Sequence, residues 1–480
     1  MRVLSALAVI AIALLLASCS AVVGQRRDCA SSDECRSQFG FGSVCGGDGL
    51  CRTLPPHPRC TRSDPPELLE HPERHGDTIV VGTIYSATEA GQVTLRAAEL
   101  AFRQARRAGG VYGRDVALLH CDPSPRVGDE LDDPVASAAV ASYLAELGVP
   151  AILGPTTSAR TLAAHEALRG RDVLLVSPSA TSSELEEIDD TTPDDEQPGL
   201  LWRTVPSDDL QGRVIASDMR MRGVTSLSIL YRPDTYGDAL AALVQRALAG
   251  TIAVRADPFT PDTLAARVVE LADRDDDEVL FVSSILAESI GFLDAASVSD
   301  SLRARYLARG IFLPDSASHP QLLTEVTPAA RELFANVRGT RPAVFEHLGL
   351  RDELFAAFVV EYGGDPAASS FTAQSYDAAW LVLYGVAWAL VQEDALTGTT
   401  IARGLRHVSA GLPQSIRPST WGDLTAAFAE GASVDVEGAS GPLDYDLSTE
   451  ELLAPIEVWT LQQDGASWTV RSEYVVSPRE

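Results

Sequence analysis

Hydroxyl side chains gather in two turns, each of which follows a short apolar segment of the chain. The turn at residues 154–158 follows the segment 151–153, and the turn at 177–181 follows the segment 173–176. Hydroxyls, together with the free backbone N–H groups at a helix amino terminus, can bind an anion such as a carboxylate. Helix capping and turn formation are the alternative roles of these side chains. Two such turns after consecutive strands favour a binding site.

Alternating strands and helices must position these turns. Residues 78–84 form a continuous apolar run, which is typical of a buried parallel strand. A helix with one apolar face follows, and the alternation continues with a strand at 116–120 and a helix at 134–147. This order predicts a right-handed, doubly wound sheet, in which ligands bind beyond the carboxyl ends of the strands.

The later part of the chain repeats this construction. The pattern predicts helices at 210–221 and 239–248 and strands at 226–231, 279–283 and 311–313. A chain of 480 residues is long enough for two large lobes. We therefore predict the α/β class, with two Rossmann-like doubly wound lobes and a ligand cleft between them.

The amino terminus carries an export signal. An apolar run at residues 3–17, too short to span a bilayer comfortably, ends in Leu16-Ala17-Ser18-Cys19, which resembles the bacterial lipoprotein cleavage box. The resemblance implies that residues 1–18 are a signal peptide and that Cys19 carries a lipid anchor. An ordinary secretory signal is the alternative. Ser20 favours the outer membrane in a cell with two membranes, so we expect a lipid-anchored protein of the periplasm or outer membrane.

Six further cysteines indicate disulfides, because an even number in an exported chain reads as paired thiols. They are Cys29, Cys35, Cys45, Cys51, Cys60 and Cys121. We expect the first four to pair among themselves in a small module within residues 19–60, which leaves Cys60 for Cys121. Zinc is the alternative for the cluster, although paired C-x2-C knuckles are missing. Residues 61–76, rich in proline and charge, are predicted to be a linker.

Composition and motifs argue against two classes of function. The net charge is −29, all 38 basic residues are arginine, and no basic patch stands out, so nucleic acid is not an expected partner. The chain has no Gly-x-Ser-x-Gly, His-Glu-x-x-His or phosphate-loop motif, and its eight histidines are scattered. We therefore expect neither an enzyme nor a bound cofactor or metal.

Several motifs together resemble the type I periplasmic solute-binding proteins, specifically the branched-chain amino acid (leucine/isoleucine/valine) receptors of ABC transporters. The motifs are the two hydroxyl turns, Gly-Gly-Val-Tyr-Gly-Arg at 109–114, Tyr-Gly at 236–237, Ser-Tyr-Asp-Ala at 375–378 and the stretch 438–446. The resemblance covers roughly residues 77–470. It implies two lobes joined by three crossings, which close around a ligand by hinge motion.

The resemblance also implies the boundaries of the lobes. The first lobe would comprise residues 77–201 and 339–430, and the second would comprise residues 202–338 and 431–480. In the first lobe, Thr157 with Ser158, and Thr181, would hold the ligand's α-carboxylate. The carbonyl of Ser179 would accept a hydrogen bond from the ligand's α-ammonium.

Two residues of the second lobe complete the site that the resemblance implies. Asp315 would face the α-ammonium, and Tyr236 would cover the ligand. A turn-forming aspartate and an ordinary packed aromatic residue are the alternatives. The chain departs from the family at residues 283–286, where an aromatic wall is common, so the side-chain pocket stays undefined and leucine itself is in doubt.

The sequence therefore favours a solute-binding lipoprotein. We expect it to act as a monomer that captures an amino acid or similar small zwitterion for an ABC permease. The alternative is an envelope sensor or interaction protein that keeps the fold without transport. The cysteine module and the outer-membrane address favour this second possibility, since neither is needed to deliver a solute.

Overall fold

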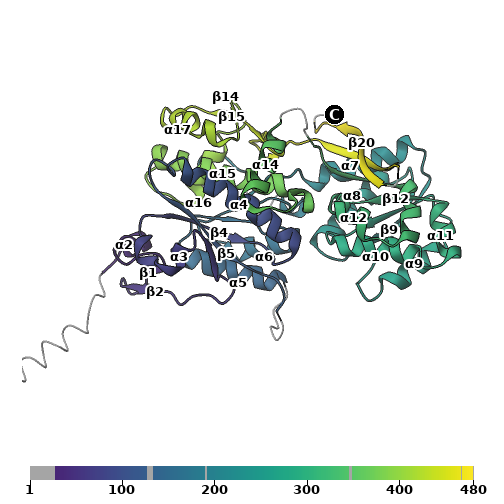
Figure 1. Cartoon of the computed structure of the whole chain (residues 1–480), viewed down its shortest axis with the longest axis horizontal. Coiled ribbons are helices and arrows are strands. Elements are labelled where there is room, and N and C mark those ends of the chain that lie inside the picture. The colour runs from purple at the N-terminus through teal and green to yellow at the C-terminus, as the bar shows by residue number, and fades with distance from the viewer. Residues whose placement is uncertain are drawn as a thin grey trace, which may run out of the picture.

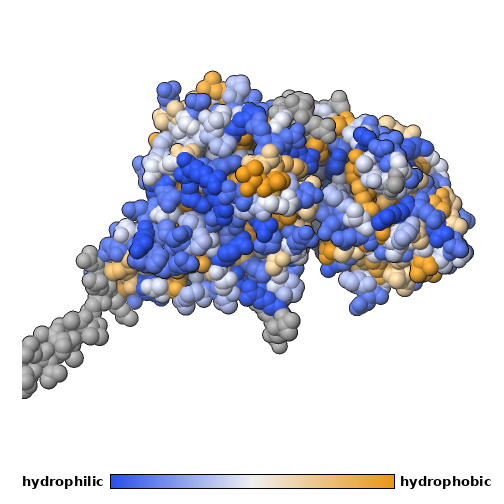
Figure 2. All heavy atoms as spheres, viewed as in Figure 1, coloured by the Kyte–Doolittle hydropathy of each residue, from blue (hydrophilic) through white to orange (hydrophobic). Residues whose placement is uncertain are grey.

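Two α/β lobes lie side by side in the computed structural model of the chain (Figure 1). The structure describes residues 28–126, 133–186, 188–189, 192–344, 349–465 and 467–478. The predicted signal peptide and Cys19 lie outside these residues. No helix among the described residues is long and apolar enough to cross a membrane. Hydrophilic residues cover most of the visible face of both lobes (Figure 2).

The first lobe is built on a six-stranded sheet with the order β3-β5-β4-β6-β7-β8. The strands are β3 (Arg62–Asp64), β4 (Ile79–Ile84), β5 (Val116–Cys121), β6 (Ala151–Leu153), β7 (Leu174–Ser177) and β8 (Leu201–Arg203). All neighbours are parallel except β3, which runs antiparallel to β5. Every residue of β4, β5 and β6 is buried, as their continuous apolar sequences predict.

A long buried helix, α15 (Thr372–Gln392), lies at the centre of this lobe's helical layer. Every residue from Thr372 to Ala389 is buried, which fits a helix that is apolar on all sides. It packs against α4 and α16. The other α-helices of the lobe are α3 (Glu67–Glu70), α4 (Glu89–Arg107), α5 (Asp133–Glu146), α6 (Ser158–Leu168), α14 (Leu350–Tyr362), α16 (Gly398–Leu405) and α17 (Trp421–Ala429).

The second lobe has a seven-stranded sheet with the order β10-β9-β11-β12-β13-β19-β20. Its strands are β9 (Ser226–Tyr231), β10 (Ala253–Pro258), β11 (Glu278–Val282), β12 (Gly310–Leu313), β13 (Val337–Pro342), β19 (Ile456–Asp464) and β20 (Ser467–Val476). Its helices are α7 (Asp208–Met221), α8 (Thr235–Leu248), α9 (Leu264–Ala272), α10 (Leu286–Ala296), α11 (Asp300–Leu307), α12 (Pro320–Glu325) and α13 (Pro328–Arg331). Strands β9 to β13 are parallel, and β19 runs antiparallel to both β13 and β20. The two doubly wound α/β lobes confirm the predicted fold class.

The chain crosses between the lobes three times: between β8 and α7, between β13 and α14, and after β18 (Glu451–Leu452). The last crossing corrects an expectation, because residues 431–452 pack with the first lobe rather than the second. Val434, Val436 and Leu443 belong to the core that contains α15. The carboxylate of Asp377 in α15 accepts hydrogen bonds from the backbone N–H groups of Ala439 and Ser440, at 2.9 and 2.7 Å. These contacts hold the hairpin of β15 (Val434–Gly438) and β16 (Gly441–Pro442) on the first lobe.

Three disulfides confirm that the first four cysteines pair among themselves and that Cys60 pairs with Cys121, and they settle the pairing within the module. Cys29 pairs with Cys45, Cys35 with Cys51, and Cys60 with Cys121. The sulfurs of Cys29, Cys35 and Cys45 lie within 4.8 Å of one another, but all three belong to disulfides, which leaves no thiolate for zinc. The first two bridges staple a small module of α2 (Ser32–Phe39), β1 (Ser43–Cys45) and β2 (Cys51–Thr53).

The cysteine module is docked on the first lobe. The Arg36 guanidinium donates to the carbonyls of Leu147 and Gly148, at 3.0 and 2.8 Å. Residues 61–76, predicted to be a linker, instead extend the sheet through β3, and Leu68 is fully buried. The prolines and charged residues of this segment argued against a strand, but a short strand at the edge of a sheet tolerates both.

A candidate ligand site between the lobes

The two hydroxyl turns of the first lobe face the second lobe. They follow β6 and β7, at the carboxyl edge of the sheet, as predicted. Thr157 is the N-cap residue of α6 and its side chain makes no capping bond. The hydroxyl of Ser158 accepts a hydrogen bond from the backbone N–H of Ser182 at 3.2 Å. The Ser182 hydroxyl in turn donates to the carbonyl of Thr235 in the second lobe at 2.9 Å, which joins the two lobes directly.

Other hydroxyls of these turns bond to the chain itself. The Ser179 hydroxyl donates to the carbonyl of Thr156 at 2.8 Å, which braces one turn against the other. Thr181 donates to a carboxylate oxygen of Asp208 at 3.1 Å. Asp208 is the first residue of α7, immediately after the first crossing. Thr181 therefore lies beside an acidic group that the sequence analysis did not select.

Tyr236 and Asp315, predicted from separate motifs, contact each other. The Tyr236 hydroxyl donates to a carboxylate oxygen of Asp315 at 2.9 Å. Tyr236 lies in the first turn of α8, which begins before the expected residue 239 because Asp234 accepts hydrogen bonds from the N–H groups of Tyr236 and Gly237. A Cβ at Gly237 would lie 1.9 Å from the carbonyl oxygen of Arg232, so this tight turn requires glycine.

Asp208 and Asp315 form a pair of buried acids with Tyr236 and Thr181. Asp208 is 0% exposed and Asp315 is 3% exposed. Burial, followed by the charge of Asp315, raises the pKa of Asp208 well above its usual value. Burial also raises the pKa of Asp315, while its hydrogen bond from Tyr236 opposes this shift. Two buried carboxylates in one place favour a cationic partner, because a positive charge offsets both their desolvation and their repulsion.

Asp208 was missed because its role depends on a contact across the first crossing. In the sequence it stands in Pro-Ser-Asp-Asp, which reads as a helix start with a serine cap, and Ser207 does cap α7. One signal could have found it: an acid directly after a lobe crossing stands next to the cleft. One oxygen of Asp208 has no hydrogen-bond partner among the described residues, and neither has the amide nitrogen of Gln211 one turn later.

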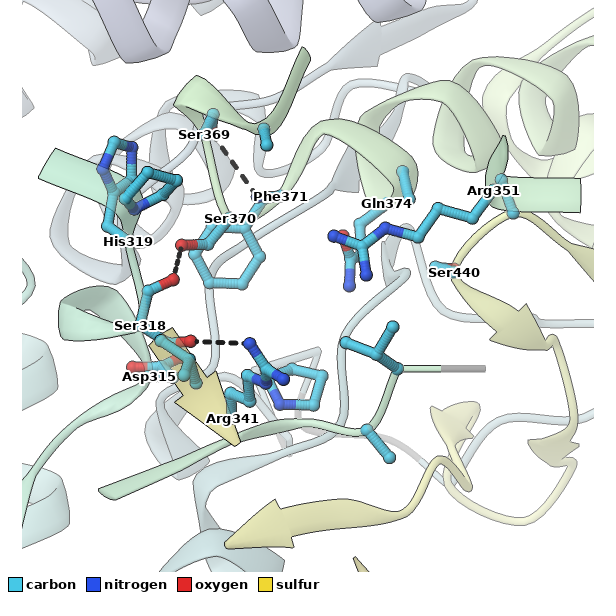
Figure 3. Close-up of a pocket in the computed structure, with 18 of the residues that line it drawn as sticks. Asp315, Ser318, His319, Arg341, Arg351, Ser369, Ser370, Phe371, Gln374 and Ser440 are labelled. Atoms are coloured by element: carbon cyan, nitrogen blue, oxygen red, sulfur yellow. Dashed lines mark hydrogen bonds between the residues drawn. The ribbon is translucent and has the colours of Figure 1, made fainter. Parts of the chain in front are cut away.

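A pocket of about 300 Å³ adjoins Asp315 and is lined by both lobes (Figure 3). Two hydrogen bonds cross it. The His319 Nε2–H donates to the carbonyl of Ala368 at 2.7 Å, and the Ser370 hydroxyl donates to the carbonyl of Ser318 at 2.8 Å. Burial lowers the pKa of His319, which favours the neutral form of its ring. The volume lies at the lower end of the range for small-molecule sites.

Comparison with known proteins gives matches over most of the chain. The family described as "Periplasmic binding protein" matches residues 78–423. The chemotactic signal transduction system substrate-binding protein BasB of Halobacterium salinarum is 27% identical over 402 residues, which cover 81% of this chain and 87% of BasB.

Solved structures show the same fold. One is the branched-chain amino acid transporter substrate-binding protein LivJ of Streptococcus pneumoniae, in complex with isoleucine. It superposes on this chain with a TM-score of 0.60 at 18% identity, and the match covers 82% of this chain and 99% of LivJ. An ABC transporter solute-binding protein from R. palustris, in complex with 4-hydroxybenzoate, gives a TM-score of 0.63 at 15% identity over 84% of this chain and 97% of that protein.

Proposed function

The chain belongs to the type I periplasmic binding protein family, and from this premise we propose that it is an extracytoplasmic solute-binding lipoprotein. It captures an amino acid or a similar small zwitterion between its lobes for ABC-type import. The observation that carries this proposal is the buried acid pair, Asp208 and Asp315, beside the hydroxyl turns of the opposite lobe. An ammonium group would neutralise the pair, and a carboxylate would suit the turns.

Each end of the ligand has its own partners in this proposal. The ammonium group lies against Asp315, with Asp208 behind it and Tyr236 covering it. The carboxylate lies at the amino end of α6, where Thr157 and Ser158 offer hydroxyls and the helix offers N–H groups and its positive dipole end. Because the ligand contacts both lobes, it stabilises the closed form.

The relatives support a small organic acid or amino acid as the ligand. LivJ was solved with isoleucine, and the R. palustris protein was solved with an aromatic acid. Both ligands carry a carboxylate, and only the amino acid carries an ammonium group. The acid pair at Asp208 and Asp315 favours the amino acid for this chain.

The lipid anchor at Cys19 would hold the first lobe near the membrane. The cysteine module is attached to that lobe by the Cys60–Cys121 bridge and by Arg36. The second lobe makes none of these contacts among the described residues. It would therefore be the lobe that moves when the cleft closes.

A sensory role is the second candidate. BasB is named as a substrate-binding protein of a chemotactic signal transduction system, and it matches most of this chain. In that role the closed, liganded form would be read by a receptor rather than by a permease. Genes for an ABC permease and ATPase beside this one would support import, and their absence would favour the sensor.

Ligand-induced stabilisation tests the proposed function. The full chain, purified in detergent, is screened by thermal shift against the twenty amino acids and related small acids. A ligand at a hundred times its dissociation constant stabilises the folded protein by roughly 2.7 kcal/mol. Asp315→Asn and Thr181→Ala should abolish the shift, whereas Asp300→Asn, on the exposed start of α11, should preserve it. A folded protein that responds to no compound would refute the proposal.

A further inference from the structure

The amino terminus of α15 opens into the pocket beside Asp315. This helix has 21 residues, and no side chain caps its amino end. Ser369, Ser370, Phe371 and Gln374, which surround that end, line the pocket (Figure 3). The first N–H groups of a helix and its positive dipole end attract an anion.

A buried amide in the same place indicates that the pocket binds a polar group. Gln374 is only 8% exposed, and its side-chain oxygen has no hydrogen-bond partner among the described residues. An unpaired buried polar atom is costly unless a ligand pairs with it. The amide of Gln374 has an oxygen that accepts and a nitrogen that donates. Rotation of the amide group by 180° exchanges the two atoms, and the nitrogen can then donate to a carboxylate.

Two arginines line the pocket, and the charge of one of them, Arg341, is balanced by Glu457. Arg341 lines it, and its guanidinium is fixed by Glu457 at 2.6 Å and by the Ser318 hydroxyl at 3.0 Å. Arg351 lies across the pocket from Ser318, next to Gln374 (Figure 3). Asp315 is the only acidic residue among the described residues of the lining, and it lies on the other side from Gln374. The pocket therefore has a carboxylate at Asp315, and the guanidinium of Arg351 lies on the side toward α15.

We propose that this pocket is a side-chain subsite that takes the side-chain carboxylate of an acidic α-amino acid whose ammonium group lies at Asp315. The inference rests on the proposed function and names its ligand class. A branched aliphatic side chain would leave Gln374 and the amino end of α15 without a partner. A side-chain carboxylate pairs with both, next to the charge of Arg351.

Glutamate, glutamine and leucine form the panel that tests this subsite. Glutamate and glutamine have the same shape and differ in charge, so their affinities report the carboxylate alone. We expect calorimetry on the full chain in detergent to give about tenfold tighter binding for glutamate than for either other amino acid. Leucine or glutamine binding as tightly as glutamate would overturn the subsite and leave the proposed function standing. Binding of no amino acid at all would overturn both.

Two matched arginine variants separate the pocket from the overall charge of the lobe. Arg351→Gln removes a positive charge from the pocket, and Arg417→Gln removes one from a surface pair with Glu353 outside it. We expect Arg351→Gln to reduce the preference for glutamate over glutamine about tenfold, and Arg417→Gln to leave it unchanged. Gln374→Leu should also reduce it. An unchanged preference in both pocket variants, each shown to be folded, would overturn the proposal.

Discussion

His319 connects the two lobes, and its removal should weaken ligand binding by a calculable amount. Its Nε2–H donates to the carbonyl of Ala368 in the first lobe at 2.7 Å, and its Nδ1 accepts from the N–H of Gln321 at 3.1 Å, which caps α12. His319→Ala removes both bonds. A buried neutral hydrogen bond contributes about 1 kcal/mol, and an N-cap contributes about 1 kcal/mol more.

Of the two bonds of His319, only the one to Ala368 joins the lobes and so stabilises the closed form. Its loss should therefore raise the ligand's dissociation constant about fivefold, the equivalent of about 1 kcal/mol. His319→Asn separates the two terms, because asparagine can still cap α12 but is too short to replace the imidazole at Ala368. We expect calorimetry to show the fivefold weakening in both variants. Thermal unfolding without ligand should show a loss of about 1 kcal/mol more in the alanine variant than in the asparagine variant.

The same contacts predict a pH dependence. The bond at Nδ1 needs a neutral ring, because a protonated Nδ1 would point a donor at the Gln321 N–H, whereas Nε2–H can donate to Ala368 in either protonation state. Burial lowers the pKa of His319, although Glu325, Asp365 and Glu89 act in the opposite direction. A lowered pKa means that the stabilisation is fully present above about pH 6.5, the ordinary histidine value, and is lost as the pH falls toward the folded-state pKa. Two results would refute the reasoning: ligand binding by His319→Asn that is as tight as that of the unmodified chain, and a free energy of unfolding that has the same pH dependence in both proteins.

Three further predictions concern stability. Replacing both Cys60 and Cys121 by serine opens a loop with a sequence separation of 61 residues, so the free energy of unfolding should fall by about 4 kcal/mol in denaturant titrations; an unchanged midpoint would contradict this. Leu68→Ala should cost about 2–5 kcal/mol, because residue 68 is fully buried in the core of the first lobe, whereas a true linker position would cost nothing measurable. Burial raises the pKa of Asp377 to about 7, so its protonation stabilises the folded chain at low pH, and this contribution is lost as the pH rises through 7. The fall in unfolding free energy between pH 5 and pH 8 should be smaller in Asp377→Asn, and an equal fall in both proteins would exclude Asp377 as its source.

Much of the fold was predictable because it depends on local patterns. The continuous apolar run at 78–84 has the sequence of a strand that is buried on both faces, and it is one. The hydroxyl turns could be placed at one edge because parallel strands end together. The pairing of Cys60 with Cys121 followed once the other four cysteines were assigned to a small module.

Other features were not predictable, because they depend on contacts between distant residues. Residues 61–76 look like a linker until β3 pairs with β5, more than fifty residues later. The hairpin after residue 431 belongs to the first lobe because Asp377, which lies in helix α15, accepts hydrogen bonds from the backbone of the hairpin. Neither contact leaves a local signal.

The sequence by itself therefore determined the alternation of strands and helices, the disulfide module and the hydroxyl turns, because periodicity, cysteine count and turn residues act over short distances. Only the tertiary structure decided that Asp208 lies beside Thr181, that Tyr236 bonds to Asp315, and that the amino end of α15 lines a pocket with Asp315. These groups come from segments that the three crossings bring together. Their chemistry depends on burial and mutual distance, which no single segment encodes.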